Sequence, residues 1–321
     1  MKAAVIESAG SAPHYADFAE PVVDEGREVV SLVAAGIHPI VRGLASGAHY
    51  GSTGRWPLIP GVDAVARADD DTLLYTGYVA APYGTFAERM AVPASLRLPL
   101  PAGADPVQVA AGMNPGLSSW MPLVARKDEL GSLGTVLIIG VTGTAGLLAV
   151  QNAFALGADR VVGAGRDLER LSAAGELGAQ AVALTGDRAA DAAALRTALG
   201  EGNPSIVLDF VWGAPAEAAF AALARRGLTE DEDDTSYVEI GSFAAPEASV
   251  PASLLRSTRI RLLGSGAGSS SMADLLRQLP AYLDLIAAGT VVVPAQTYPL
   301  ARIQDAWADA SRAGVRAVVV P

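Results

Sequence analysis

Residues 135–166 have the sequence TVLIIGVTGTAGLLAVQNAFALGADRVVGAGR, and this stretch decides the fold. Its start, Val136 to Ile139, is a short β-branched and aliphatic run of the kind that forms a fully buried parallel strand. A G-x-x-G-x-x-G pattern follows, and residues 147–156 have the composition of a packed helix. A second strand is predicted at residues 160–164. This order of strand, glycine turn, helix and strand predicts a βαβ unit of a parallel sheet.

The glycine turn of this unit predicts a binding site for a pyrophosphate. Without side chains, the backbone can turn tightly and a phosphate can approach the N-terminus of the helix. The free N–H groups and the helix dipole favour negative charge there. A tight turn that binds no ligand is the alternative. The turn residues expected to contact the cofactor are Gly140, Thr142, Gly143, Thr144, Ala145 and Gly146.

The end of the second strand distinguishes between the two nicotinamide cofactors. An NAD site usually has Asp or Glu there, which binds the ribose 2′-hydroxyl and would repel a 2′-phosphate. Here the strand ends in Gly165 and Arg166, and Asp167 is predicted to cap a helix over residues 168–177. A glycine leaves room for the phosphate, and an arginine can bind it with a planar, charged fork. NADPH is therefore the predicted cofactor; the alternative for Arg166 is an exposed surface charge.

Composition sets the broad class of the protein. The 321 residues are enough for two domains, and 51% hydrophobic with 18% charged residues is typical of a well-packed α/β protein. There is no uninterrupted apolar run of about twenty residues, so a membrane span is not expected. The chain has no cysteine, which excludes disulfides and thiol catalysis and fits a cytoplasmic location. A net charge of −11 argues against a nucleic-acid partner.

The texture of the sequence changes near residue 105. Before it, short strand-like segments at Ala3–Glu7, Glu28–Ala35 and Phe86–Val92 are separated by Gly, Pro and Asp, which is typical of a small, mostly β domain. After it, helices and strands alternate, beginning with helices predicted at Val107–Gly112 and Leu117–Arg126.

The alternating region predicts six strands connected by crossovers, and therefore a doubly wound parallel sheet. We expect the last strand-like segment, residues 315–320, to return to the first domain, so that the nucleotide-binding fold is an insertion. The predicted domains are residues 111–265 for the cofactor and residues 1–110 with 266–321 for the substrate. The six strands are predicted at residues 136–139, 160–164, 181–184, 206–210, 237–240 and 260–263.

Five further motifs accompany the glycine turn: AGIHP at 35–39, IPGVD at 59–63, GTFAE at 84–88, GLSSW at 116–120 and VEIG at 238–241. Their order and spacing resemble those of the medium-chain dehydrogenase/reductase superfamily. Within it, the zinc-independent quinone oxidoreductase-like branch is the most similar. The resemblance implies a Rossmann sheet inserted between the parts of a smaller, mostly β, GroES-like catalytic domain. It also implies a homodimer joined through the edge of the large sheet.

The resemblance further implies where the cofactor and a metal would bind. Zinc alcohol dehydrogenases hold their metal at positions that match His38, Val62 and Asn114 here. Valine cannot ligate zinc and an asparagine amide is a poor ligand, so no metal is expected. A rebuilt site from His38, His49 and Asp63 is the alternative. Family positions that line the cofactor match Ser118, Ser119, Gly241, Ser242, Gly264, Ser265 and Arg312.

A cofactor site without a metal favours hydride transfer to an acceptor that is already electron-poor. Quinones and enones spread the incoming charge onto a carbonyl oxygen, which one or two hydrogen-bond donors stabilise. The candidate donors are His38, Tyr50 and Tyr83, and Asp63 lies at an acid position common to the family. A structural role is the alternative for His38 and for Asp63. We predict an NADPH-dependent reductase of quinones or conjugated carbonyl compounds, with a small electrophilic substrate and neither nucleic acid nor membrane as partner. A ketone or imine reductase of a specialised pathway and a catalytically inactive NADPH-binding sensor or scaffold are the alternatives.

Overall fold

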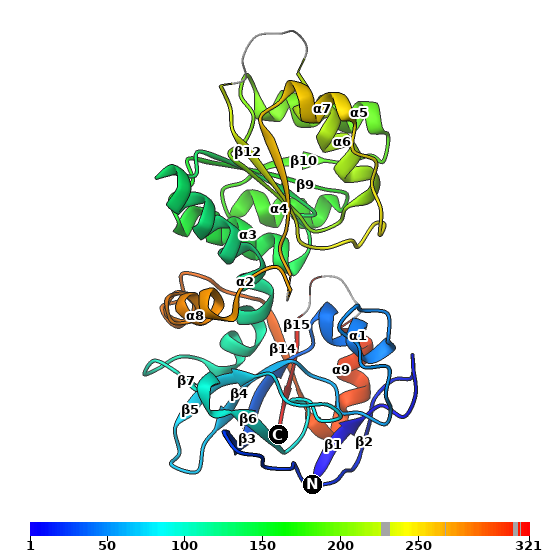
Figure 1. Cartoon of the computed structure of the whole chain (residues 1–321), viewed down its shortest axis with the longest axis vertical. Helices are drawn as coiled ribbons and strands as arrows, with labels where there is room; N and C mark the ends of the chain where they lie inside the picture. The colour runs from blue at the N-terminus through cyan, green and yellow to red at the C-terminus, as the bar shows by residue number, and fades with distance from the viewer. Residues whose placement is uncertain (226–231, 267, 311–313, 315) are drawn as a thin grey trace. The chain divides into compact units, whose positions relative to one another are not determined.

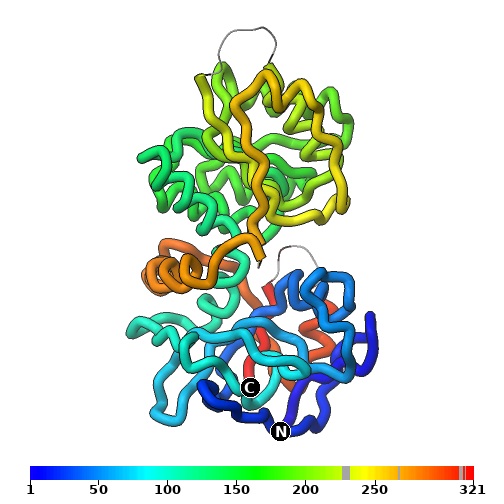
Figure 2. Tube along the Cα trace, viewed as in Figure 1, coloured from blue at the N-terminus to red at the C-terminus, as the bar shows by residue number. Residues whose placement is uncertain are grey.

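The computed structural model describes residues 1–225, 232–266, 268–310, 314 and 316–321, which divide into two compact units (Figure 1). The first unit contains Met1–Asn114 and Leu276–Pro321, and the second contains Pro115–Leu275. In the trace of Figure 2, the red C-terminal strand lies among the blue N-terminal segments, while the green and yellow middle of the chain forms the other unit. The second unit is therefore an insertion within the first.

A parallel sheet of six strands forms the centre of the second unit. Its strands are β8 (Thr135–Ile139), β9 (Arg160–Gly165), β10 (Gln180–Ala183), β11 (Ile206–Asp209), β12 (Thr235–Glu239) and β13 (Ile260–Gly264). Their spatial order is β10-β9-β8-β11-β12-β13, and every neighbouring pair is parallel. Strands β9 and β10 thus extend to one side of β8, and β11, β12 and β13 extend to the other, as in doubly wound dinucleotide-binding sheets.

Helices cover both faces of this sheet and create two hydrophobic cores. Leu137 and Ile139 of β8 belong to one core, whereas Val136 and Ile138 belong to the other, because successive side chains of a strand point to opposite faces. The helices of this unit are α3 (Thr144–Ala155), α4 (Leu168–Glu176), α5 (Arg188–Leu199), α6 (Gly213–Leu223) and α7 (Ala252–Ser257), with most of α2 (Pro106–Leu130).

The first unit is built on a mostly antiparallel sheet. The strand order is β14-β15-β3-β4-β5-β7, β6 also pairs with β3, and β1 with β2 forms a separate ribbon. The antiparallel pairing of β15 with β3 joins the end of the chain to its beginning. The elements are β1 (Lys2–Val5), β2 (His14–Asp17), β3 (Arg27–Gly36), α1 (Pro39–Ser46), β4 (Asp63–Arg67), β5 (Leu73–Gly77), β6 (Arg89–Pro93), η1 (Ala94–Leu96), β7 (Leu98–Pro99), α8 (Met272–Ala287, which begins in the second unit), β14 (Ala295–Pro299), η2 (Leu300–Arg302), α9 (Ile303–Asp309) and β15 (Arg316–Val320).

The parallel sheet and the separate, mostly antiparallel sheet confirm the predicted fold class. The prediction of two helices at 107–112 and 117–126 was wrong, because α2 runs without a break through Pro115 and Pro122. A proline inside a helix removes the N–H that would bond to the carbonyl four residues earlier. For Pro122 that carbonyl belongs to Ser118, and the hydroxyl of Ser265 donates to it at 3.2 Å. A side chain thus replaces the missing backbone donor.

Candidate functional site

The glycine turn between β8 and α3 has the tight geometry that the sequence predicts. Gly140 has φ +85°, in the left-handed region, and its N–H donates to the carbonyl of Ala164 on β9 at 2.9 Å. A Cβ on Gly146 would lie 2.5 Å from the Gly140 oxygen and 2.6 Å from the Cα of Val141. Only glycine therefore allows the first turn of α3 to pack against the end of β8.

Gly143 differs from the other two glycines because the protein itself does not require it. Its φ of −77° suits any residue, and an added Cβ would meet only the Gly140 oxygen, at an ordinary 3.5 Å. Gly143 is the N-cap of α3, and no side chain caps the helix. The open space and the uncapped N–H groups at a helix N-terminus fit a pyrophosphate.

The end of β9 places a free cation next to this turn. Arg166 is exposed and forms no ion pair with any residue that the structure describes. Asp167 is engaged elsewhere, because its carboxylate caps α4 by accepting a hydrogen bond from the Arg170 N–H at 3.1 Å, as predicted. A Cβ on Gly165 would lie 2.6 Å from Thr142 Cγ2, so this glycine lets the turn lie against the strand. The arrangement fits a phosphate bound by Arg166 without a competing acid.

The remaining predicted cofactor positions of this unit follow β12 and β13, at the same carboxyl edge of the parallel sheet as the glycine turn. The N–H of Gly241 donates to the carbonyl of Asp209 at 3.2 Å, and Ser242 is exposed. A Cβ on Gly264 would have no neighbour within 4 Å. Ligands of doubly wound sheets bind at this edge. Arg312 lies outside the described residues.

Three predicted serines are engaged within the protein, and one of them is Ser265, whose hydroxyl donates to the carbonyl of Ser118. Ser119 is fully buried, donates to the carbonyl of Gly116 at 3.1 Å and accepts from the side-chain amide of Asn152 at 2.9 Å. The hydroxyl of Ser118 donates to the carbonyl of Pro115 at 2.6 Å. These bonds tie α2 to α3, so Ser119 has a structural role in this arrangement.

Asp209, at the end of β11, was not singled out in the sequence. It is fully buried, and its carboxylate accepts hydrogen bonds from the Tyr237 hydroxyl at 2.6 Å and from the N–H groups of Val211 and Trp212 at 2.9 and 3.0 Å. Burial raises the pKa of Asp209, although these three donors act in the opposite direction. The contacts hold Val211 against Gly140, where a Cβ would come within 2.8 Å of it. Asp209 thus supports the glycine turn from behind.

The first unit brings His38 and Asp63 together in its interior. The Nε2 atom of His38 lies 3.3 Å from Oδ1 of Asp63, and the two residues are 1% and 5% exposed. The other carboxylate oxygen of Asp63 accepts a hydrogen bond from the hydroxyl of Tyr75 at 2.9 Å. His38 follows β3 while Asp63 and Tyr75 lie on β4 and β5, so three segments far apart in sequence build the cluster.

A buried arginine completes this cluster. Arg316, on β15, donates from Nη1 to the carbonyl of Ile37 at 2.8 Å. Burial lowers the pKa of the guanidinium to about 10, and Asp63 acts in the opposite direction. Burial also lowers the pKa of His38; Asp63 raises it and Arg316 lowers it further. The balance favours a neutral imidazole beside a carboxylate and a guanidinium.

Tyr50 lies apart from this buried cluster. It is 77% exposed, and its ring stacks on that of His49 with centroids 4.1 Å apart. Tyr83, the third candidate donor, uses its hydroxyl to donate to the carbonyl of Glu20 at 2.9 Å. Among the described residues, no group of three His, Asp or Glu side chains is arranged to hold a metal ion. His49 thus does not join His38 and Asp63 in such a group.

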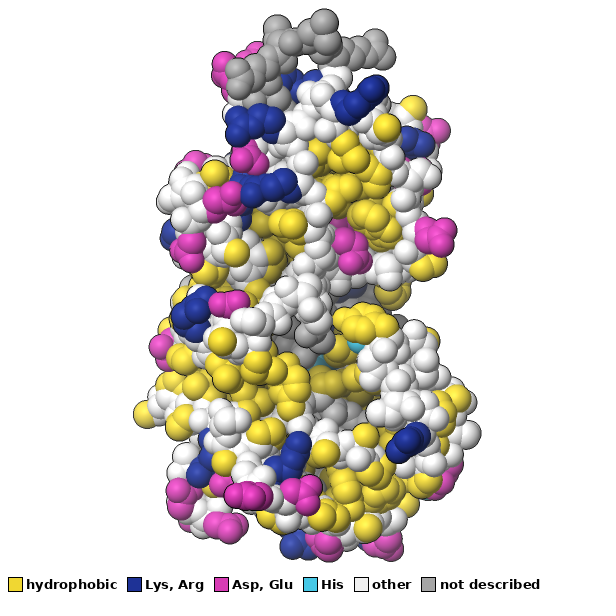
Figure 3. Space-filling model, viewed as in Figure 1, with side chains coloured by type: hydrophobic (Ala, Val, Ile, Leu, Met, Phe, Trp, Pro, Cys, Tyr) yellow, Lys and Arg dark blue, Asp and Glu magenta, His cyan; other side chains and the backbone are white. Residues whose placement is uncertain are grey.

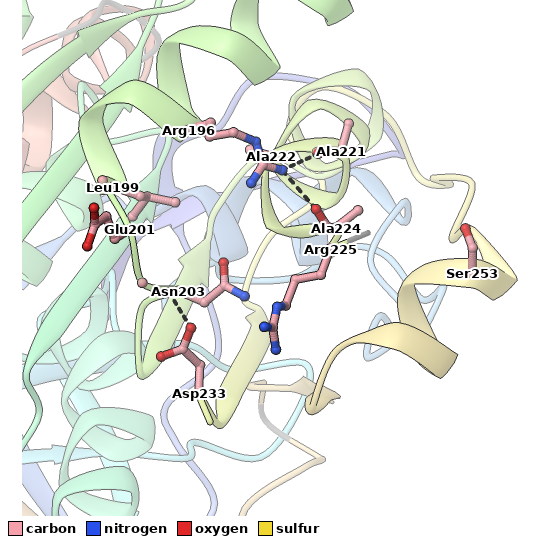
Figure 4. Close-up of a pocket in the computed structure, with 12 residues that line it drawn as sticks. Arg196, Leu199, Glu201, Asn203, Ala221, Ala222, Ala224, Arg225, Asp233 and Ser253 are labelled. Carbon is pink, nitrogen blue, oxygen red and sulfur yellow. Dashed lines mark hydrogen bonds between the residues drawn. The ribbon is translucent and has the colours of Figure 1, made fainter. Parts of the chain in front are cut away.

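A cavity of about 860 Å³ lies elsewhere in the second unit (Figure 4). It is lined by residues that precede β11 and β12, such as Asn203 and Asp233, so it lies at the amino edge of the sheet, opposite the glycine turn. Its polar groups bind one another: Arg196 donates to two carbonyls at the end of α6, and the N–H of Asn203 donates to Asp233 at 2.8 Å. This cavity is therefore separate from the candidate cofactor site.

Comparison with known proteins shows which family this chain resembles. The sequence model of the zinc-binding dehydrogenase family matches residues 145–287. A probable NADPH-dependent quinone reductase of Emericella nidulans is 27% identical over 362 aligned positions that cover 100% of both chains. The quinone oxidoreductase of Thermus thermophilus, whose structure was also solved with NADPH, is 27% identical, with a TM-score of 0.73 over 100% of both chains. The chain is thus similar, over its whole length, to quinone oxidoreductases of the medium-chain dehydrogenase/reductase superfamily.

Further solved structures share the fold at lower identity. A mycobacterial quinone oxidoreductase has a TM-score of 0.80 with 21% identity, again over 100% of both chains. None of the described helices is both long enough and apolar enough to cross a membrane.

Proposed function

We propose that this protein is an NADPH-dependent reductase that transfers hydride to a quinone or a conjugated carbonyl compound. One observation carries the proposal: the turn at Gly143 leaves room for a pyrophosphate beside Arg166, which has no partner in the part of the chain that the structure describes. The Emericella relative is named as an NADPH-dependent quinone reductase, which supports both the cofactor and the reaction class.

The second unit supplies the cofactor site in this proposal, and residues 111–265 form the cofactor domain. The N–H groups at the start of α3 bind the pyrophosphate, and Arg166 binds the 2′-phosphate. Gly241, Ser242 and Gly264 line the same edge of the sheet. Arg166 explains a preference for NADPH, because a cation at the tip of β9 attracts the phosphate that an acid would repel.

The predicted substrate domain, residues 1–110 with 266–321, supplies the polar groups that act on the substrate. NADPH supplies the hydride, and the protein contributes binding, orientation and electrostatics. Hydride transfer to a quinone or enone places negative charge on a carbonyl oxygen, and a nearby hydroxyl or N–H donor stabilises it. Tyr50 is one such donor, and His38 with Asp63 behind it is a second polar group that can contact the substrate. We propose that the reaction needs no zinc, because valine at position 62 cannot replace a histidine ligand.

The experiment that tests this function uses the purified full chain. NADPH binding is measured by fluorescence, and NADPH oxidation is followed with a panel of quinones, enals, ketones and imines. We expect turnover with quinones or enals. Turnover with ketones or imines alone would contradict the proposed substrate class. Tight NADPH binding without turnover on any compound would instead support a sensor or scaffold.

The surface also supports a small-molecule partner. On the face shown in Figure 3, basic and acidic side chains are interspersed and do not form a basic patch. A net charge of −11 is consistent with this distribution.

We further propose that the protein forms a homodimer through β13. This strand is at the edge of the parallel sheet, pairs only with β12 and exposes Leu262 and Leu263 at 37% and 50%. An edge strand with exposed apolar side chains readily pairs with a second copy of the same strand. Light scattering tests this: we expect twice the mass of one chain, and a monomer for Leu263→Lys. A monomeric wild type would contradict the proposal.

A further inference from the structure

His38 has an unusual position for a residue at the start of a helix. It is the N-cap of α1, yet its side chain does not cap the helix. Instead the imidazole lies over Gly36, where a Cβ would come within 2.5 Å of Cε1 and 2.7 Å of Nε2. Any larger residue at position 36 would displace the ring, so the glycine directs His38 towards Asp63.

Asp63 is itself held in place from two sides. The Tyr75 hydroxyl donates to Oδ2 of its carboxylate at 2.9 Å, and the Thr85 hydroxyl donates to its backbone carbonyl at 3.0 Å. Because Tyr75 occupies Oδ2, the oxygen that remains for His38 is Oδ1. The Nε2 to Oδ1 distance of 3.3 Å is within ion-pair range, but the contact does not have full hydrogen-bond geometry. Such contacts are often long without ligand and shorten when it binds.

The charges around His38 favour its neutral form. Arg316 is buried beside the cluster and opposes protonation of the imidazole, whereas Asp63 favours it. Tyr75 and Tyr78 also face Asp63, and burial, followed by the charge of Asp63, raises the pKa of each of them. Both tyrosines are therefore protonated at neutral pH, and Tyr75 can only donate to the carboxylate.

The other ring nitrogen of His38 is the feature that needs an explanation. Nδ1 is buried and has no hydrogen-bond partner among the described residues. A neutral imidazole has one N–H donor and one acceptor nitrogen. If Nε2 carries the proton and faces Asp63, then Nδ1 is the unprotonated acceptor nitrogen. An acceptor without a hydrogen-bond donor is unfavourable in the protein interior.

We propose, building on the reductase function above, that Tyr75 and Asp63 are positioning residues for His38. They hold it in the tautomer with the proton on Nε2, so that Nδ1 accepts a hydrogen bond from an N–H or O–H group of a bound ligand. His38 then orients the ligand and does not donate a proton to it. The donor to the developing oxyanion is left to Tyr50.

Nuclear magnetic resonance of imidazole nitrogens tests the tautomer directly. The chain has three histidines, and His14→Asn and His49→Asn in the ¹⁵N-labelled full chain assign the signals. We expect His38 to have a single neutral tautomer, protonated at Nε2, across roughly pH 6 to 8. Asp63→Asn should reverse the tautomer, because the new amide can donate to Nε2. Tyr75→Phe, which removes only a hydroxyl, should produce a mixture of the two tautomers.

Three results would overturn the proposal: a proton on Nδ1 in the wild type, a mixture of tautomers in the wild type, or an unchanged tautomer in Tyr75→Phe. This last variant keeps the test decisive even if Asp63→Asn does not fold. Kinetics provide an independent readout, since we expect Tyr75→Phe to lower kcat/KM by about tenfold, at a temperature where the variant, which loses one buried hydrogen bond, is still fully folded. If the wild type reduces no acceptor, the proposed function fails while the spectroscopic result on His38 stands by itself.

Discussion

The glycine turn and the His38 cluster solve opposite problems. The turn at Gly140–Gly146 is made of backbone, is open at Gly143 and has an exposed cation, Arg166, beside it. The cluster around His38 is made of side chains and contains buried charges. In the proposed function a phosphate fills the empty space at the turn, so added volume there should weaken binding. The cluster depends on which atoms carry protons, so isosteric changes should damage it.

The largest expected effect tests the role of volume at the turn. In Gly146→Ala the new methyl would contact two backbone atoms at 2.5–2.6 Å, so α3 must move away from β8. We expect this to lower the free energy of unfolding by about 2–3 kcal/mol and to abolish NADPH binding. Denaturant unfolding and fluorescence titration measure the two effects.

Gly143→Ala is the matched control for this change. Its methyl finds room within the protein, so unfolding should change by only about 0.5 kcal/mol. NADPH affinity should nevertheless fall, because the methyl occupies the side from which the phosphate approaches. Unchanged NADPH binding in Gly143→Ala would show that the phosphate does not use this turn.

Removal of the free cation should have the next largest effect. A charge-assisted contact between arginine and phosphate contributes about 2 kcal/mol, so Arg166→Ala should weaken NADPH binding by roughly 30-fold. NADH binding should not change, because NADH lacks the 2′-phosphate. Parallel titrations with both cofactors measure this difference. Equal losses for both would contradict the assignment of Arg166 to the phosphate.

The sequence predicts the turn well because the information is local. Strand, glycines and helix follow one another within 32 residues, and each has a physical reason that does not depend on the rest of the chain. The cap by Asp167 and the doubly wound order of the six strands are confirmed for the same reason. Whether these residues bind NADPH as proposed is a question for the titrations.

The His38 cluster could be predicted only in part because its information is not local. His38 and Asp63 stand out as polar residues in short motifs, but Tyr75 and Arg316 carry no motif of their own. Their contacts follow from the pairing of β4 with β5 and of β15 with β3. The continuity of α2 through Pro122 likewise depends on a distant residue, because the hydroxyl of Ser265 donates to the carbonyl of Ser118.

The buried His38 cluster, unlike the glycine turn, should also make the stability of the protein depend on pH. Burial lowers the pKa of His38 in the folded chain, while an unfolded histidine has an ordinary value of about 6.5. At a pH above that value, His38 is unprotonated in both the folded and the unfolded chain. At a lower pH only the unfolded chain binds this proton. The contribution of His38 should therefore lower the free energy of unfolding by about 1.4 kcal/mol for each pH unit of acidification, until the pH reaches the folded pKa of His38.

His38→Asn isolates this contribution, because the other titrating groups are present in both proteins. The difference in unfolding free energy between the variant and the wild type should therefore change with pH below about 6.5 and be constant above it. A parallel pair of curves for wild type and His38→Asn would show that His38 becomes protonated in the folded protein.

The smallest effect on stability is expected at Tyr50, the exposed residue of the first unit. Its ring stacks on His49 but is 77% exposed, so Tyr50→Phe should change the free energy of unfolding by less than about 0.5 kcal/mol. If its hydroxyl stabilises the oxyanion, kcat should fall by about tenfold or more while NADPH affinity is unchanged. Because Tyr50→Phe retains the ring, a role as an aromatic wall predicts no loss of kcat. Tyr50→Ala separates these roles further, since loss of the wall would raise KM for the acceptor without a specific effect on kcat.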